Sequence, residues 1–272
     1  MTTRRRLDAE MVRRGLVPTR EQAQDAIAAG SVVVGGAVAN KAARMVAAGE
    51  PVEILGPAPR FVSRGGLKLD AALDRFDVDP TGKTALDAGA STGGFTDCLL
   101  QRGAASVVAV DVGRGQLHER LRNDPRVRVV EQTNVRHLDV ADLDGAPFPL
   151  VTVDLSFISL ATVAPAVADR LAAPGADVVT LVKPQFEAGR REVSRGKGVV
   201  RDPEVWSDVL ARTRSALAAQ GAAMMDAMVS PLLGADGNVE FLAHFRAHSA
   251  TDAGVDLDGL VAAAAALAAE RV

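Results

Sequence analysis

An acidic residue stands just before a glycine-rich stretch in the segment LDAGASTGGFTDCLL, residues 86–100. The segment runs from a strand-like into a helix-like pattern, an outline that several nucleotide-binding sites share. A phosphate-binding P-loop would end in Gly-Lys-Ser/Thr, and no lysine stands at that place. A dinucleotide fingerprint would need glycine where Ser91 stands. Both of these sites are therefore disfavoured.

Asp87 indicates a different ligand. A carboxylate at a strand end repels a pyrophosphate but attracts an ammonium group, which S-adenosylmethionine carries together with a sulfonium. Asp111 ends the next apolar run, where an acid would accept hydrogen bonds from ribose hydroxyls. Asp139 is expected near the adenine, with a solvated loop acid as its alternative. For the whole segment, the alternative is a plain strand-turn-helix corner. The expected cofactor-binding residues are Asp87, Gly89, Ser91, Gly93, Gly94, Asp111 and Asp139.

Four more charged residues lie beside apolar runs. Asp154 and Lys183 stand where two predicted strands end, and Glu240 stands where a late strand begins. Lys68 lies in the predicted helix before the glycine-loop strand. Any one of them alone fits a surface charge, but their joint placement around one sheet edge favours a reactive site.

From residue 84 onward, strand and helix patterns alternate, which is typical of a doubly wound, mostly parallel α/β sheet. The sequence therefore predicts a Rossmann-like domain with ligands at the carboxyl ends of the strands. A helix is also expected over 66–78. The strands are expected at 84–88, 106–111, 127–131, 150–154, 177–182, 223–229 and 239–246, and the helices at 94–102, 114–122, 158–171 and 203–219.

A small α+β unit is expected ahead of this domain. Helical spacing runs over 4–16 and 19–30, and SVVVGGAVAN (31–40) predicts two strands joined by a Gly-Gly turn. Another strand is expected within 45–55. We thus expect an N-terminal domain at 1–58, a linker at 59–65 and the Rossmann-like domain at 66–272.

Charge and composition restrict the function. Residues 1–64 carry 10 Lys/Arg and 6 Asp/Glu, although the whole chain has a net charge of −3. A basic module on an acidic body favours an anionic partner, with a solvated basic face as the alternative. No apolar run reaches the roughly 18 residues of a membrane span, and no signal peptide is evident, so we expect a cytoplasmic protein. The four histidines form no ligand cluster, so no metal is expected.

These motifs resemble the TlyA (hemolysin-A-like) family of 2′-O-ribose RNA methyltransferases, whose catalytic domain is similar to the FtsJ-type enzymes. The resemblance implies that Lys68, Asp154, Lys183 and Glu240 form their Lys-Asp-Lys-Glu tetrad. Residues 6–36 resemble the RNA-binding domain of the S-four type. One departure is Phe61, since the family often has tryptophan before VSRG.

The implied tetrad makes chemical sense for methyl transfer to a ribose hydroxyl. A lysine can accept the hydroxyl proton only if its pKa is lowered by burial or by a neighbouring cation. Lys183 is the expected base and Lys68 the neighbouring cation, while Asp154 and Glu240 orient the two amines. S-adenosylmethionine supplies the methyl group.

The resemblance implies methylation of cytidines in 16S and 23S ribosomal RNA of the ribosomal subunits, linked to capreomycin and viomycin susceptibility. A basic loop after Lys183 would clamp RNA phosphates, unless it is a solvated connector. Two other functions stay open, a membrane-active hemolysin and a non-catalytic RNA-binding ribosome assembly factor. The expected RNA-binding residues are Arg4, Arg5, Arg6, Arg14, Arg20, Arg64, Arg195 and Lys197.

Overall fold

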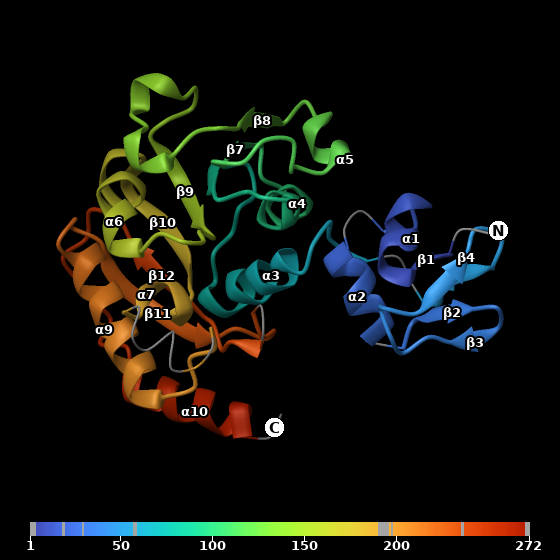
Figure 1. The fold of residues 1–272 in the computed structure, drawn as a ribbon. Coiled ribbons are helices and arrows are strands. Elements are labelled where there is room, and N and C mark those ends of the chain that lie inside the picture. Colours follow the sequence, from blue (N-terminus) through green and yellow to red (C-terminus); the bar gives the residue numbers. More distant parts are fainter. Residues whose placement is uncertain are drawn as a thin grey trace. The chain divides into compact units, whose positions relative to one another are not determined.

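The computed structural model describes residues 4–17, 20–28, 30–56, 59–189, 196, 198–234 and 237–269. The chain divides into two compact units, residues 1–63 and 64–272. This division falls inside the segment 59–65 that the sequence predicts as a linker. Each unit has its own hydrophobic core and is described by itself (Figure 1).

The N-terminal unit packs two helices against small antiparallel sheets. The strand β2 lies between β3 and β5, and β1 pairs with β4. Gly35 and Gly36 form the tight β2–β3 turn that the sequence predicts. Leu7, Met11 and Ile27 are buried in the core. The elements are β1 (Arg4–Arg6), α1 (Leu7–Arg13), α2 (Arg20–Ala28), β2 (Val32–Val34), β3 (Ala37–Val38), β4 (Met45–Ala47) and β5 (Val52–Ile54).

The first helix is shorter than its apolar spacing predicts. Arg4–Arg6 form a strand against Met45–Ala47, and the helix begins only at Leu7, the first apolar residue of the pattern. It ends at Arg13, two residues before Gly15. The three arginines are exposed, so no burial holds them in a helix. The sequence pattern extends the helix over residues 4–6, and this part of the prediction is wrong, because these residues form a strand.

The C-terminal unit contains a seven-stranded sheet in the order β11-β12-β10-β9-β6-β7-β8. Its strands are parallel except β12, which is antiparallel to both of its neighbours. The predicted doubly wound α/β class is confirmed. The strands are β6 (Thr84–Ala88), β7 (Ser106–Val110), β8 (Val127–Val130), β9 (Phe148–Val153), β10 (Ala172–Val182), β11 (Ala223–Val229) and β12 (Phe241–Arg246).

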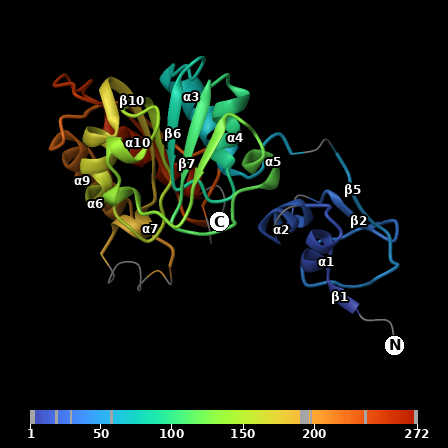
Figure 2. The same cartoon turned by 90° about the horizontal axis from the view of Figure 1, so that it is seen from above.

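Helices cover both faces of this sheet (Figure 2). On one face α3 packs against α4, and on the other α9 packs against α6 and α10. The helices are α3 (Gly65–Phe76), α4 (Gly94–Gln101), α5 (Glu119–Arg122), α6 (Leu160–Ala164), α7 (Pro184–Glu187), α9 (Pro203–Ala218) and α10 (Leu257–Ala269), with short turns η1 (Val135–His137), η2 (Val140–Asp142) and η3 (Pro165–Arg170).

Two predicted helices are shorter or broken. Of 114–122 only Glu119–Arg122 is helical, because Gly115 adopts a left-handed φ of +67°. The predicted helix 158–171 changes at Pro165 from α6 to the π-helical turn η3, because proline lacks the N–H that would continue the α-helical bonding.

The strand order reverses at β6, whose neighbours are β7 and β9. In doubly wound sheets this reversal opens a crevice at the carboxyl ends of the strands. The glycine loop follows β6, Asp111 follows β7 and Asp154 follows β9. The topology therefore brings the glycine loop, Asp111 and Asp154 to the carboxyl edge of the sheet.

Candidate active site

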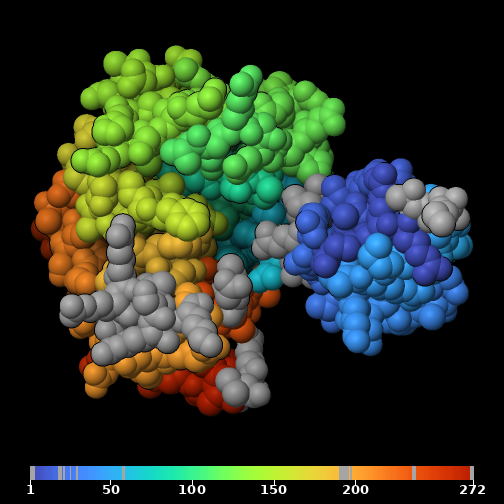
Figure 3. Space-filling view, in the orientation of Figure 1, coloured from blue at the N-terminus to red at the C-terminus, as the bar shows by residue number. Residues whose placement is uncertain are grey.

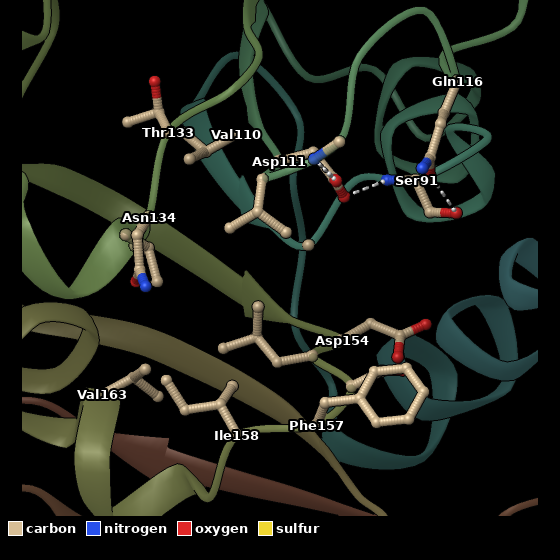
Figure 4. A pocket seen from close by; sticks show the side chains of 16 residues that line it. Ser91, Val110, Asp111, Gln116, Thr133, Asn134, Asp154, Phe157, Ile158 and Val163 are labelled. Atoms are coloured by element: carbon tan, nitrogen blue, oxygen red, sulfur yellow. Dashed lines mark hydrogen bonds between the residues drawn. The ribbon is translucent and has the colours of Figure 1, made fainter.

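A cavity of about 510 Å³ opens at this carboxyl edge. In Figure 3 the green surface after β7 and the yellow-green surface after β9 lie next to each other on the face shown. Figure 4 places Ser91, Asp111 and Gln116 on one wall, with Asp154, Phe157 and Ile158 opposite. The cavity is lined by Gly89, Ser91, Val110, Asp111, Val112, Gly113, Gln116, Thr133, Asn134, Val135, Asp154, Leu155, Ser156, Phe157, Ile158 and Val163.

The glycine loop brings backbone to the floor of this cavity. Gly89 has a φ of +90°, and a Cβ atom there would lie 2.3 Å from the backbone oxygen of Asp154. Only glycine fits such an approach of β6 to β9. Ser91 also lines the cavity, whereas Gly93 and Gly94 are the N-cap and first residue of α4 and do not line it. Gly93 and Gly94 therefore form the turn into α4 and are not part of the cavity wall.

Asp111 lies where sequence reasoning expects a ribose acceptor. Its Oδ2 accepts a hydrogen bond from the backbone N–H of Ser91 at 2.8 Å, and its Oδ1 accepts one from that of Gly113 at 2.7 Å (Figure 4). These bonds fix the carboxylate against the glycine loop. Each oxygen keeps a further lone pair for a ligand hydroxyl.

Asp87 is the acid that the sequence predicts next to the ammonium group of the cofactor, which stays a prediction. Its carboxyl group is fully buried and is not among the cavity-lining residues. Thr96 donates to its Oδ2 at 2.7 Å and Thr152 donates to its Oδ1 at 3.1 Å. Burial raises the pKa of Asp87 to about 7, and the negative charge of Asp154 acts in the same direction. Asp87 therefore supports the loop from beneath.

Asp139 also lies away from the cavity lining. It is exposed and caps the short turn η2, where its N–H donates to Asp142 Oδ2 at 2.8 Å. Thr133 and Asn134 occupy the part of the wall that follows β8. Asp139 thus lies outside the lining residues, and its place near an adenine stays a prediction. Along the chain, the short turn η1 lies between the wall residue Asn134 and Asp139.

Lys183 and Asp154 form one half of the predicted tetrad. Lys183 Nζ lies 2.5 Å from Asp154 Oδ1 and donates to Ser156 Oγ at 3.2 Å. Asp154 and Ser156 both line the cavity. Lys183 follows β10, so the pair joins the ends of two neighbouring strands. Lys183 itself is not a lining residue, so its amine lies next to two residues of the cavity wall.

Lys68 and Glu240 form the other half. Lys68 Nζ lies 2.5 Å from Glu240 Oε2, and both side chains are buried. A Cβ atom on Gly234 would lie 2.0 Å from Glu240 Oε1, so the chain around Gly234 closes over this carboxylate. Neither residue of the pair lines the cavity. The structure thus joins the four tetrad residues as two ion pairs of different accessibility.

Several wall residues are not evident from the sequence alone. Gln116, Thr133 and Asn134 are ordinary polar residues in loops, and no spacing singles them out. Phe157 is more unusual, because its side chain is 91% exposed and its φ is +64°. Its ring lies 4.8 Å from that of Phe186, centroid to centroid. An aromatic residue three positions after the predicted strand 150–154 is the signal that could have identified it.

The predicted RNA-binding arginines of the N-terminal unit differ in their surroundings. Arg4 and Arg5 are exposed on β1. Arg6 and Arg20 both bind the buried carboxylate of Asp8, at 2.9 and 2.8 Å. Their hydrogen bonds, with that of Arg6 the strongest, hold the pKa of Asp8 well below its usual range. Asp8 holds both of these guanidinium groups in place, and both arginine side chains are about half exposed.

Arg14 has a structural role instead. It donates to Glu10 at 2.8 Å and to the backbone oxygens of Glu50 and Ala47 at 2.7 and 3.0 Å. These bonds tie α1 to the β4–β5 connection. The contact of Arg14 with RNA stays a prediction.

The remaining predicted RNA contacts lie in the C-terminal unit. Arg64 donates to the backbone oxygen of Leu233 at 2.5 Å, next to the Gly234 that covers Glu240. Arg195 and Lys197 lie outside the described residues.

The described residues hold neither a candidate metal site nor a candidate membrane span. Within the ranges given above, no three His, Cys, Asp or Glu side chains come together as a possible metal site. Among the helices of the same ranges, none is long and apolar enough to cross a membrane.

Comparison with known proteins identifies two families in the chain. The FtsJ-like methyltransferase family matches residues 61–247, and the S4 domain family matches residues 5–52. The 16S/23S rRNA (cytidine-2′-O)-methyltransferase TlyA of Mycobacterium tuberculosis is 47% identical over 267 residues, 96% of both chains. The putative rRNA methyltransferase YqxC of Bacillus subtilis is 47% identical over 247 residues, 90% of this chain and 87% of that protein.

A solved structure agrees over the whole length. The putative hemolysin from Streptococcus thermophilus is 37% identical, covers 100% of both chains and superimposes with a TM-score of 0.79. The family match extends over more than half of the chain, and the sequence resemblance is confirmed. The chain therefore belongs to the TlyA (hemolysin-A-like) family of FtsJ-like methyltransferases, with an S4 domain ahead of its methyltransferase domain.

Proposed function

We propose that the protein methylates the ribose 2′-hydroxyl of cytidines in 16S and 23S ribosomal RNA, using S-adenosylmethionine. The names of its relatives support the substrate. The observation that carries the chemistry is the Lys183–Asp154 pair at the edge of a cavity whose opposite wall presents Asp111. Ribosomal RNA as substrate in turn favours a cytoplasmic location.

The cavity fits the cofactor in size and in donor set. Its volume of about 510 Å³ lies in the range of small-molecule sites. Asp111 is fixed by two backbone N–H groups and can accept from the ribose hydroxyls. Val110, Ile158 and Val163 provide apolar wall for the base. When bound there, S-adenosylmethionine supplies an electrophilic methyl group.

Lys183 is suited to take the proton from the attacking ribose hydroxyl. Asp154 and Ser156 can accept the two N–H bonds of the neutral amine, which leaves its lone pair to accept the hydroxyl proton. Lys68, paired with Glu240, contributes a second positive charge in the same domain. The main contribution of the protein is then alignment of the hydroxyl oxygen with the methyl group.

Phe157 gives the rim of the cavity an aromatic surface. Its exposed ring can stack on a nucleobase, an interaction that tolerates any base because each has a π-face. The S4 unit supplies the RNA affinity through Arg4, Arg5, Arg6 and Arg20. The predicted basic loop, including Arg195 and Lys197, would add phosphate contacts.

Incubation of the protein with labelled S-adenosylmethionine and purified 30S and 50S subunits tests this function. We expect label on the 2′-oxygen of a cytidine, mapped by mass spectrometry of ribonuclease fragments. A binding-only assembly factor would bind the subunits without transferring label. A hemolysin would release dye from lipid vesicles, which the proposed function does not predict. Loss of the methyl group in cells should change susceptibility to capreomycin and viomycin.

A further inference from the structure

Beyond the tetrad, a partly buried carboxylate connects the two chain segments that carry Lys183 and Asp154. Glu187 ends α7, four residues after Lys183, and its Oε1 accepts a hydrogen bond from the backbone N–H of Leu160 at 2.7 Å. Leu160 begins α6, six residues after Asp154. The bond spans 27 residues of sequence.

This bond lies where the sheet no longer holds the two segments together. The parallel pairing of β9 with β10 ends at Val153 and Thr180. Beyond that point, side chains alone join the segments 154–160 and 183–187. They do so through the Lys183 contacts to Asp154 and Ser156, the Phe157–Phe186 ring contact and the Glu187–Leu160 bond.

Among these contacts, the one from Glu187 is the best suited to hold position. The first N–H groups of a helix have no partner inside it, and the backbone of Leu160 is buried. Leaving such a donor unpaired is costly, which favours the bonded arrangement. Burial raises the pKa of Glu187, while the bond from Leu160 and the charge of Arg212 oppose this change. The other contacts involve either Lys183 itself or the exposed ring of Phe157.

We propose that Glu187 is a positioning residue, which aligns Lys183 with Asp154 by bonding the start of α6. This inference rests on the proposed function, because it concerns the geometry of that reaction. It assigns Glu187 no contact with the substrate or cofactor. Removal of the Glu187 carboxylate should slow the chemical step, because a displacement of Lys183 by about 1 Å can cost roughly 100-fold in rate.

The variants Glu187→Ala and Glu187→Gln test the inference. Alanine removes the acceptor, whereas the amide oxygen of glutamine can still accept from Leu160. We expect a kcat about 10- to 100-fold lower for Glu187→Ala, with the Kd for S-adenosylmethionine within about twofold of wild type. Glu187→Gln should restore most of the rate. Equal loss in both variants would show that the negative charge matters rather than the bond, and would overturn the inference.

Ser159→Ala is the matched control. Ser159 Oγ accepts from the N–H of Thr162 at 3.3 Å, so it caps the same helix end without joining the two segments. We expect its kcat to stay close to wild type. If Ser159→Ala slows the reaction as much as Glu187→Ala, the effect belongs to α6 stability, and the positioning role is wrong.

Amide hydrogen exchange provides a readout that needs no methyl transfer. The Leu160 amide should lose protection in Glu187→Ala and keep it in Glu187→Gln, with full-length protein in both cases. Unchanged protection in Glu187→Ala would overturn the inference even if the wild-type protein did not methylate ribosomal subunits. Absence of methylation by wild type would instead contradict the proposed function, so the two failures can be distinguished.

Discussion

The two lysine–carboxylate pairs of the site have the same chemistry but different access. In both, Nζ lies 2.5 Å from a carboxylate oxygen. The side chains of Lys68 and Glu240 are 10% and 3% exposed, whereas those of Lys183 and Asp154 are 13% and 23% exposed. Of the four residues, Asp154 alone is among the cavity-lining residues. We therefore propose that the second pair reacts and that the first holds charge and structure.

Lys183→Ala should give the largest effect. It removes the proposed base while leaving the buried pair intact, and general base catalysis contributes about 100- to 10,000-fold in rate. Single-turnover methyl transfer should fall by that amount, while calorimetric binding of S-adenosylmethionine stays near wild type. A variant that binds poorly but reacts normally once saturated would assign Lys183 to binding instead.

Lys68→Met should act mainly on stability. It leaves the Glu240 carboxylate buried without its cation, and breaking a buried pair costs about 3–5 kcal/mol of unfolding free energy. Denaturant unfolding of the full chain measures this loss. The double variant Lys68→Met with Glu240→Gln is the control and should recover part of it. A single variant as stable as wild type would remove the distinction between the pairs.

Asp111→Ala should affect the cofactor rather than either pair. Loss of its acceptors, and of the bonds that fix the loop at Ser91 and Gly113, should weaken S-adenosylmethionine binding about 10- to 100-fold. Asp139→Ala is the matched control, since Asp139 lies outside the cavity lining. If Asp139→Ala gives the larger loss in calorimetry, the cofactor site has been placed wrongly.

Asp87 is a third carboxyl group near the site, and its side-chain partners are hydroxyl groups rather than a cation. Its pKa is about 7 in the folded protein and near 3.8 ordinarily, so the folded state holds the proton more tightly. Its contribution to stability is therefore present at low pH and is lost as pH rises towards 7.

The variant Asp87→Asn mimics the protonated group and should remove this loss. Its unfolding free energy relative to wild type should increase between pH 5 and pH 8, as measured by denaturant titration at each pH. A difference that stays constant over this range would show that Asp87 does not titrate there.

The sequence predicts the class of the fold and the four tetrad positions better than the wall of the cavity. The apolar runs that end at Asp154 and Lys183 place both residues at strand ends, so these residues could be found from the pattern. Gln116 and Asn134 could not, because loop geometry alone brings them to the cavity. Asp87 illustrates another limit, since its place at a strand end does not reveal that two threonines enclose it.

The most direct test of the reactive pair is the single-turnover rate of Lys183→Arg on ribosomal subunits. Arginine keeps the positive charge beside Asp154 but cannot give up its proton, so it cannot serve as a base. We expect no methyl transfer above that of Lys183→Ala, with cofactor and RNA binding retained. Near-normal turnover by Lys183→Arg would contradict the central claim, because the position would then need only a positive charge.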